Sequence, residues 1–441
     1  TADVVVRDPV VVAGTLPRFL NVGDTSRIHL AIDNVEGPAG DYVVEVDASG
    51  PVILPLESTH RTLKLDKGAR TALSLPVTAG GIGTARLTVR LRGQGIDVAQ
   101  DFALGIAPGT PALTHRTVRP LPAGGSVSIS NDVVADLMPG SGVVSVSVTT
   151  LGALDVPGLL QALDRYPYGC SEQVVSRALP LLYVNELAGA EALPIDLQRE
   201  ERVRNAIERV LSRQDSNGSF GLWSVGGDDI WLDAYVTDFL TRAREKGFAV
   251  PQTAFDLALE RLRNYVANTT EFERGKGQEL AYAIYVLARN GRPVMGDLRY
   301  LADVRLSQFG SAMAQAQIAA ALALLGDRRR AETAFATAMA TLRGERDTPA
   351  SRPDYGSRLR DGAALLALLG EAGTGGAEIQ QASLVVDEAR ADSRYTSTQE
   401  QAWMVLAAGA LQQENARLRL TVDGRGIDGP FYRNYRAATL D

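Results

Sequence analysis

The chain has 441 residues, too many for one ordinary hydrophobic core, and this length predicts roughly three domains. Its 52 Asp and Glu residues outnumber its 45 Lys and Arg residues and no basic tract stands out, so nothing in the composition favours a nucleic-acid partner. The apolar runs are too short to span a membrane, and a single cysteine excludes an internal disulfide framework.

Residues 1–107 alternate apolar and polar positions in short runs, such as Ile28–Ile32 and Tyr42–Val46, separated by Gly, Pro, Asn and Asp. A period of two is typical of half-buried strands. About seven such strands in a segment of this size match an immunoglobulin-like module. We therefore predict a β-sandwich over 1–107.

Strand patterns occur on both sides of a long helical region. A linker at Ala107–Pro111 leads to strands that include Gly142–Val148, too few to close a sandwich alone. Strand character returns at Arg417–Val422. We predict one β domain, made of residues 108–150 and 413–441 and interrupted by a helical insertion.

Between residues 151 and 412 the apolar period changes from two to about 3.6, in segments rich in Ala and Leu, which predicts helices. Helical hairpins that close on themselves form an α/α toroid, which needs no capping repeats. Five predicted helices begin with similar sequences, near Trp231, Glu279, Ala314, Asp361 and Glu400. The predicted helices span 154–166, 172–188, 197–214, 231–246, 251–268, 278–290, 296–306, 311–325, 327–344, 358–370, 377–391 and 398–412.

The one cysteine, Cys170, lies where the first predicted helix ends and the next begins, three residues before Gln173. Residues three apart share one face of a helix, so the sulfur and the carboxamide can meet across the first turn. If the sulfur displaces ammonia from the amide, the product is an internal thioester. A lone cysteine is more often a small buried hydrophobe, so the spacing alone leaves both interpretations open.

Three neighbours of the cysteine are candidate functional residues. Ser171 can cap the helix, and the positive end of this helix predicts a lowered pKa for a free Cys170 thiol. The same positive end is expected to stabilise the oxyanion that develops when the thioester carbonyl is attacked. Glu172 has two interpretations, a carboxylate that suits a helix start or a catalytic group. Tyr166 and Tyr168 flank the cysteine and are candidates for shielding a thioester from water, or are ordinary core residues.

The string Pro167-Tyr-Gly-Cys-Ser-Glu-Gln173 resembles the thioester signature of the alpha-2-macroglobulin and complement family, whose usual form has glycine at the position of Ser171. Further strings at Gln214–Trp223, Trp231–Tyr235 and Tyr395–Gln399 also match that family, in the same order.

The resemblance implies a multidomain fold. Residues 1–107 are expected to form a macroglobulin-like β-sandwich, and 108–150 and 413–441 two parts of a CUB-like β domain, the second of which looks short for a complete domain. Residues 151–412 are expected to form the inserted α/α-toroid thioester domain, with Cys170 and Gln173 as the cross-linked pair.

The resemblance also implies a function. Complement members use a later histidine to pass the acyl group to hydroxyls, whereas here His29, His60 and His115 all precede Cys170. Direct attack by lysine amines is then implied, as in protease-trapping members. The expected activity is a single-use endopeptidase inhibitor, not an enzyme, which captures proteases after a bait segment is cut and the protein rearranges. No cofactor and no metal ion are implied.

Ser171, the missing later histidine and the lack of disulfides resemble the bacterial members of the family. This implies a periplasmic protein that is attached to the inner membrane through a lipid anchor outside this chain, and it leaves open a cell-wall enzyme as a partner. Because the chain starts Thr-Ala-Asp, we expect a fragment of a longer protein.

Two other functions are compatible with parts of the sequence. Terpene cyclases and protein prenyltransferases are also α/α barrels, and Gln214–Trp223 resembles their Gln-Gly-Trp repeats. A cyclase needs an Asp-x-Asp-Asp acid where Asp228-Asp229 offers two carboxylates, and a prenyltransferase needs a histidine ligand for zinc that the helical region lacks. The other alternative, a structural or adhesion module with a vestigial thioester, stays open.

Overall fold

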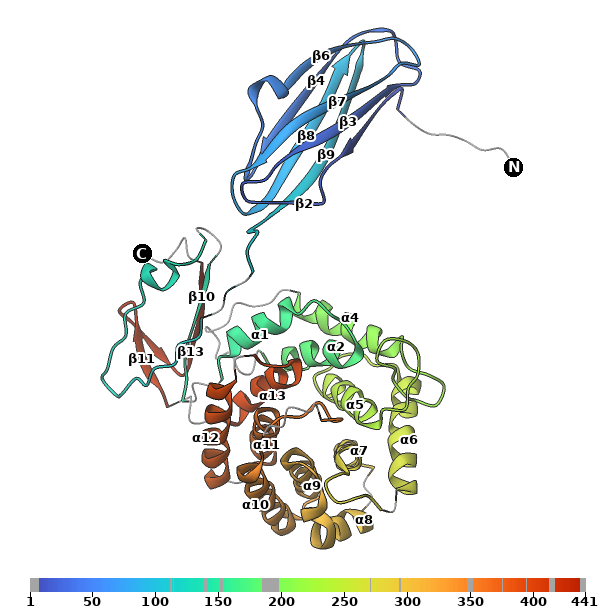
Figure 1. Ribbon diagram of the computed structural model, residues 1–441. Helices are drawn as coiled ribbons and strands as arrows, with labels where there is room; N and C mark the ends of the chain where they lie inside the picture. Colours follow the sequence, from blue (N-terminus) through green and yellow to red (C-terminus); the bar gives the residue numbers. More distant parts are fainter. Residues whose placement is uncertain are drawn as a thin grey trace. The chain divides into compact units, whose positions relative to one another are not determined.

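The computed structural model describes residues 8–111, 113, 115–138, 142–150, 154–184, 198–269, 271–292, 295–346, 352–374, 376–393, 395–411 and 417–436. It divides into two compact units, of which the first contains residues 1–144 and 435–441 and the second residues 145–434 (Figure 1). Each unit has a hydrophobic core of its own.

Strands β1–β9 of the first unit form two sheets with the orders β1-β3-β7-β5 and β2-β9-β8-β4-β6. Alternate residues of β3, including Ile28, Leu30 and Ile32, are buried, which agrees with the period of two in the sequence. The predicted sandwich is confirmed. The strands are β1 (Val10–Thr15), β2 (Phe19–Asn21), β3 (Thr25–Asn34), β4 (Gly40–Ser49), β5 (Val52–Ile53), β6 (His60–Leu65), β7 (Arg70–Ala79), β8 (Gly83–Gly93) and β9 (Ile96–Ala107).

Strands on the two sides of the helical region pair with each other. β10 (Val143–Val148) lies beside β13 (Phe431–Arg436), and β11 (Arg419–Val422) forms a hairpin with β12 (Arg425–Asp428). This pairing is expected of a β domain that a helical insertion interrupts. The boundaries assigned from the sequence, 108–150 and 413–441, stay predictions.

The helical region is an α/α toroid. Six helices, α2, α5, α7, α9, α11 and α13, pack each on the next, and α13 packs on α2 to close the ring. Helices α1, α4, α6, α8, α10 and α12 pack against the outside of these six. The helices are α1 (Val156–Arg165), α2 (Ser171–Ala178), α4 (Arg199–Leu211), α5 (Ile230–Glu245), α6 (Gln252–Asn268), α7 (Gln278–Arg289), α8 (Met295–Tyr300), α9 (Ala312–Leu324), α10 (Arg328–Gly344), α11 (Arg358–Ala372), α12 (Gly376–Asp392) and α13 (Thr398–Ala408).

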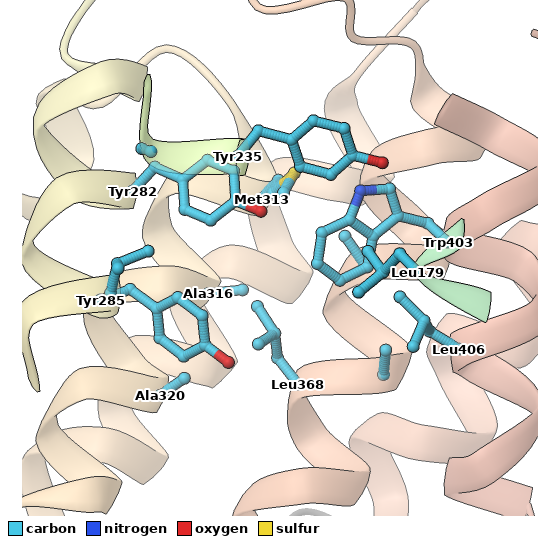
Figure 2. Packing of buried hydrophobic residues seen from close by; sticks show 14 of the residues in the cluster. Leu179, Tyr235, Tyr282, Tyr285, Met313, Ala316, Ala320, Leu368, Trp403 and Leu406 are labelled. Atoms are coloured by element: carbon cyan, nitrogen blue, oxygen red, sulfur yellow. The ribbon is translucent and has the colours of Figure 1, made fainter. Parts of the chain in front are cut away.

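The five similar sequences all begin inner helices, and α2 supplies the sixth. Inner helices are buried almost all round, whereas outer helices bury one stripe, as α10 does with Ala331, Ala334 and Ala338. Figure 2 shows large side chains, Tyr235 and Trp403 among them, packed together in the core that the inner helices share.

Two predicted helices end earlier than expected. The helix predicted over 172–188 stops at Ala178, and a 3-10 turn follows at Pro180–Leu182. Proline has no N–H to continue the α-helical hydrogen bonds, so Pro180 marks this end. The helix predicted over 296–306 ends at Tyr300 and continues as a π-helical turn over Leu301–Arg305. No helix in the described ranges is long and apolar enough to cross a membrane.

Candidate functional site

Cys170 and Gln173 meet at the start of α2. Cys170 is the N-cap residue of this helix, with φ −66° and ψ 166°, and the residue is 5% exposed. Its backbone N–H donates to Gln173 Oε1 at 3.1 Å, while the Gln173 N–H faces the sulfur, so the two residues form a reciprocal capping box. Sulfur and carboxamide therefore share the first turn. Ser171 does not cap the helix as expected, because Cys170 occupies that position.

The prediction of a lowered pKa for the Cys170 thiol is wrong. Burial raises this pKa. The backbone N–H groups of Gln173 and Glu172 and the positive charge of Arg213 lower it, but the effect of burial is larger. A thiolate loses its hydration in a buried site, and one helix end does not compensate for that loss. A thioester carries no charge, so the same burial does not disfavour it.

The two tyrosines that flank the cysteine lie differently. The Tyr166 hydroxyl is 3.4 Å from Gln173 Nε2, which donates to it, and the ring is half-buried. Burial, followed by the charges of Glu172 and Cys170, raises the pKa of Tyr166. Tyr168 is 61% exposed and contacts the Tyr166 ring edge-to-face at 5.7 Å. Tyr166 thus lies on the carboxamide, and Tyr168 packs against Tyr166 at the surface.

Glu172 is buried and forms hydrogen bonds with residues of α13, the last of the inner helices. Its Oε1 accepts hydrogen bonds from Ser176 Oγ at 2.6 Å, Thr398 Oγ1 at 3.0 Å and Gln399 Nε2 at 3.0 Å. None of these three donors is charged. The contacts position α2 against α13, and a catalytic role for Glu172 stays a prediction.

Arg213, which the sequence analysis missed, clamps the segment that carries the cysteine. Its guanidinium donates to Gly169 O at 2.9 Å, Ser171 Oγ at 3.0 Å and Leu222 O at 3.1 Å. Ser171 in turn donates from its N–H to Leu222 O and from its hydroxyl to Gly221 O, at 2.9 and 2.6 Å. The loop after α4 is therefore fixed against the start of α2.

Asp233 of α5 also binds the loop that follows α4. One of its oxygens accepts from Phe220 N–H at 2.7 Å, and the other accepts from Arg261 Nε at 3.2 Å. Burial raises the pKa of Asp233 to about 6. Tyr235, on the same helix, places its hydroxyl 2.9 Å from Ser176 Oγ of α2. The sequence strings that contain Gly221, Tyr235 and Thr398 thus all contact α2, the helix that Cys170 caps.

The remaining candidates lie elsewhere. His29 and His60 belong to the β-sandwich, His115 is exposed beside Asp136 at 3.2 Å, and the chain has no histidine after Cys170. Asp228 is fully exposed and Asp229 caps α5, accepting from Leu232 N–H, so this pair does not form the acid of a cyclase. Among the described residues no group of three His, Cys, Asp or Glu side chains could hold a metal ion.

Comparisons with known proteins agree with this site. A family model described as the A-macroglobulin TED domain matches residues 143–268. The chain is 33% identical over 429 residues to alpha-2-macroglobulin of Escherichia coli and 31% identical over 382 residues to that of Xylella fastidiosa (strain Temecula1). These alignments cover 93% and 83% of this chain. The chain belongs to the bacterial alpha-2-macroglobulin family. It spans only 26% and 23% of the length of these two relatives.

Solved alpha-2-macroglobulins have the same fold. Native E. coli alpha-2-macroglobulin, spanning domain MG7 to the C-terminus, matches with a TM-score of 0.83 at 28% identity, over 98% of this chain and 71% of that one. The Salmonella protein reacted with methylamine matches with a TM-score of 0.84 at 31% identity, over 99% of this chain and 30% of that one. Trypsin-activated E. coli alpha-2-macroglobulin matches at 28% identity with a TM-score of 0.50, over 99% of this chain and 31% of that one.

Proposed function

We propose that this chain carries the reactive thioester of a protease-trapping inhibitor. The Cys170 sulfur bonds to the Gln173 side-chain carbonyl carbon, and the amide nitrogen leaves as ammonia with the thiol proton. A lysine amine of a captured protease then attacks that carbon. A new amide bond forms, the carbon–sulfur bond breaks, and the proton that the amine loses ends on the released Cys170 thiol. The observation that carries this proposal is the buried capping box, in which Cys170 and Gln173 contact each other reciprocally.

The same geometry supplies what the reaction needs. Gln173 Oε1 becomes the oxyanion when the carbonyl is attacked, and the Cys170 N–H already donates to it at 3.1 Å. Gln173 Nε2, the atom that leaves on closure, lies beside the Tyr166 hydroxyl. Attack by an amine is the reverse of ammonia loss, so the incoming nitrogen takes the position of Nε2, under Tyr166. Tyr166 therefore shields the carbonyl and also marks the point of entry.

The whole protein's activity extends beyond this chain. We expect a bait segment elsewhere, whose cleavage drives a rearrangement that exposes the thioester, as other proteolytic switches release stored strain. Structures of E. coli alpha-2-macroglobulin activated by trypsin and by elastase, and of the Salmonella protein reacted with methylamine, support proteases and amines as its partners. The proposed activity is inhibition, and each thioester is used once because the reaction with an amine consumes it. The periplasmic location and the lipid anchor stay predictions of the resemblance.

The test is the intact mass of the freshly purified chain, before and after methylamine. A closed thioester lowers the mass by one ammonia, and methylamine then adds its own mass and releases one maleimide-reactive thiol. Cys170→Ala is the matched control and should show neither change. A chain that has aged by hydrolysis carries glutamate at position 173. An intact Gln173 amide beside a free thiol in fresh protein would contradict the proposal.

A further inference from the structure

The guanidinium of Arg213 bonds to both chain neighbours of Cys170. Its Nη2 donates to Gly169 O at 2.9 Å, and its Nη1 donates to Ser171 Oγ at 3.0 Å. These acceptors belong to the residues directly before and directly after the cysteine, so the charge of Arg213 is held beside the N-terminus of α2. The backbone N–H of Gln173 faces the Cys170 sulfur in the same turn. A positive charge and an N–H donor are therefore fixed at the helix end where the sulfur lies.

Arg213 is a buried cation whose hydrogen-bond acceptors are all neutral. The residue is 9% exposed, and its third acceptor is Leu222 O at 3.1 Å. Among the residues that the structure describes, no carboxylate forms an ion pair with Arg213. Buried charges are ordinarily paired, because water no longer compensates them. The surroundings of Arg213 therefore lack one negative charge.

A second arginine adds to the positive charge here. Arg209, four residues earlier in α4, is exposed, and its guanidinium lies against Gly169, where an added Cβ would be 2.7 Å from it. Burial and then the charge of Arg209 lower the pKa of Arg213, whereas a negative charge on Cys170 raises it. Reciprocally, burial raises the pKa of the Cys170 thiol, and the charge of Arg213 opposes that rise. A negative charge on the sulfur thus offsets an excess of positive charge.

We propose that Arg213 stabilises the Cys170 thiolate that leaves when an amine opens the thioester. This inference rests on the proposed function. The attacking nitrogen bonds to the Gln173 side-chain carbon, the carbon–sulfur bond breaks, and its electron pair stays on the sulfur. The thiolate then takes the proton that the nitrogen loses, which leaves a neutral amide and a neutral thiol. Arg213 is a positioning residue, which holds the two residues that flank the cysteine and supplies the counter-charge while the sulfur is negative.

The other titratable groups that face the cysteine do not supply this counter-charge. Glu172 of α2 is negative and raises the pKa of the thiol. The Tyr166 and Tyr355 hydroxyls have pKa values that burial raises above their ordinary value of about 10, so both stay neutral near pH 8. Of Glu172, the two tyrosines and Arg213, Arg213 alone favours a thiolate.

The pKa of the freed thiol tests this role. Methylamine opens the thioester, and the rate at which iodoacetamide then alkylates Cys170, measured against pH, gives that pKa. Arg213→Gln should raise it, whereas Arg213→Lys, which keeps the charge but not the fork of donors, should bring it back toward wild type. A merely structural role predicts the opposite direction, because a loosened helix start exposes the thiol and lowers its pKa toward the ordinary value. The measurement needs only a free thiol, so it also applies to a variant whose thioester does not close.

The rate of thioester opening is the second readout. Release of the thiol by methylamine should be about three- to tenfold slower in Arg213→Gln than in wild type, because a thiol of higher pKa leaves more slowly. Arg204→Gln is the matched control. It removes one positive charge from α4, where Arg204 pairs with Glu200 at 3.0 Å on the surface, and it should change neither readout.

The outcomes separate the two proposals. A fresh wild-type chain with an intact Gln173 amide and a free thiol overturns the proposed function, and this inference with it. If the wild-type thioester is closed, an unchanged or lowered thiol pKa in Arg213→Gln overturns only the role of Arg213, as does an unchanged opening rate. The same holds if the thiol pKa of Arg213→Lys equals that of Arg213→Gln, because charge would then not be the cause.

Discussion

The Thr398 hydroxyl donates a 3.0 Å hydrogen bond to Glu172, across 226 positions of the chain. This bond joins the first turn of α13 to the first turn of α2, the last and the first helices of the inner ring. Glu172 lies two residues after Cys170. One buried carboxylate, two residues after Cys170, therefore bonds to both ends of the inner ring.

Thr398→Val should weaken this closure. Valine keeps the shape of threonine but removes the donor, and a lost hydrogen bond to a charged group costs about 1.5–3 kcal/mol. We expect a lower free energy of unfolding and faster thiol release from the closed thioester. Chemical denaturation and maleimide labelling measure the two effects. Thr333→Val, on the exposed face of α10, removes a hydroxyl that bonds within its own helix and should change neither. Unchanged stability in Thr398→Val would show that the bond does not hold the ring.

Tyr166 offers a second test, because its ring and its hydroxyl are assigned different roles. Tyr166→Ala should speed hydrolysis, since it removes the ring that covers Gln173. Tyr166→Phe should hydrolyse slowly but react several-fold more slowly with methylamine, because the hydroxyl that meets the incoming nitrogen is gone. Melting temperatures close to that of wild type show that the toroid is intact. Equal hydrolysis rates for Tyr166→Ala and wild type would remove the ring from the mechanism.

The sequence was most informative where a local pattern decides the structure. Apolar periods predicted the sandwich and the helices, and the similar starts of five helices predicted the closed ring. Pro180 could have placed the end of α2, because a proline cannot continue a helix. The capping box also follows from short spacing, since Cys170 and Gln173 belong to one turn.

Features set by tertiary closure could not be predicted. Arg213 reaches Gly169 and Ser171 only because the loop after α4 folds back on α2. Burial in the folded protein raises the pKa of Cys170, and a helix-end argument does not include that burial.

Glu345 should make stability depend on pH. It follows α10, and its Oε1 accepts from Ala312 N–H at 2.8 Å. Burial and then the charge of Asp361 raise its pKa from 4.5 to about 8, although Arg352 and Arg360 act in the opposite direction. Between these two pKa values the folded state binds more protons than the unfolded state. The free energy of unfolding contributed by Glu345 therefore falls as pH rises through this window.

Glu345→Gln isolates that effect. Glutamine keeps the acceptor for Ala312 N–H and stays neutral, so the variant should resemble wild type near about pH 5 and exceed its stability near about pH 8.5. Denaturant midpoints at the two pH values measure the difference. Glu332→Gln, within α10, is a control at a solvent-exposed carboxylate. A wild type and a Glu345→Gln variant whose midpoints change in parallel with pH would contradict the assignment.

The activated thioester should prefer amines to hydroxyls. A neutral amine attacks the carbonyl directly, whereas a hydroxyl needs a general base or an acyl-imidazole relay. No histidine follows Cys170 in the chain, and the nearby Glu172 carboxylate is occupied by the hydroxyls of Ser176 and Thr398 and the amide of Gln399. The measurement is a competition between labelled methylamine and labelled glycerol, followed by the mass of the peptide that contains Gln173.

Glu172→Gln is the informative variant, because it retains Oε1 as an acceptor and removes the charge. We expect amine incorporation to dominate in both proteins. If wild type incorporates glycerol efficiently and Glu172→Gln abolishes this incorporation, Glu172 acts as a general base. The amine-directed mechanism would then be wrong.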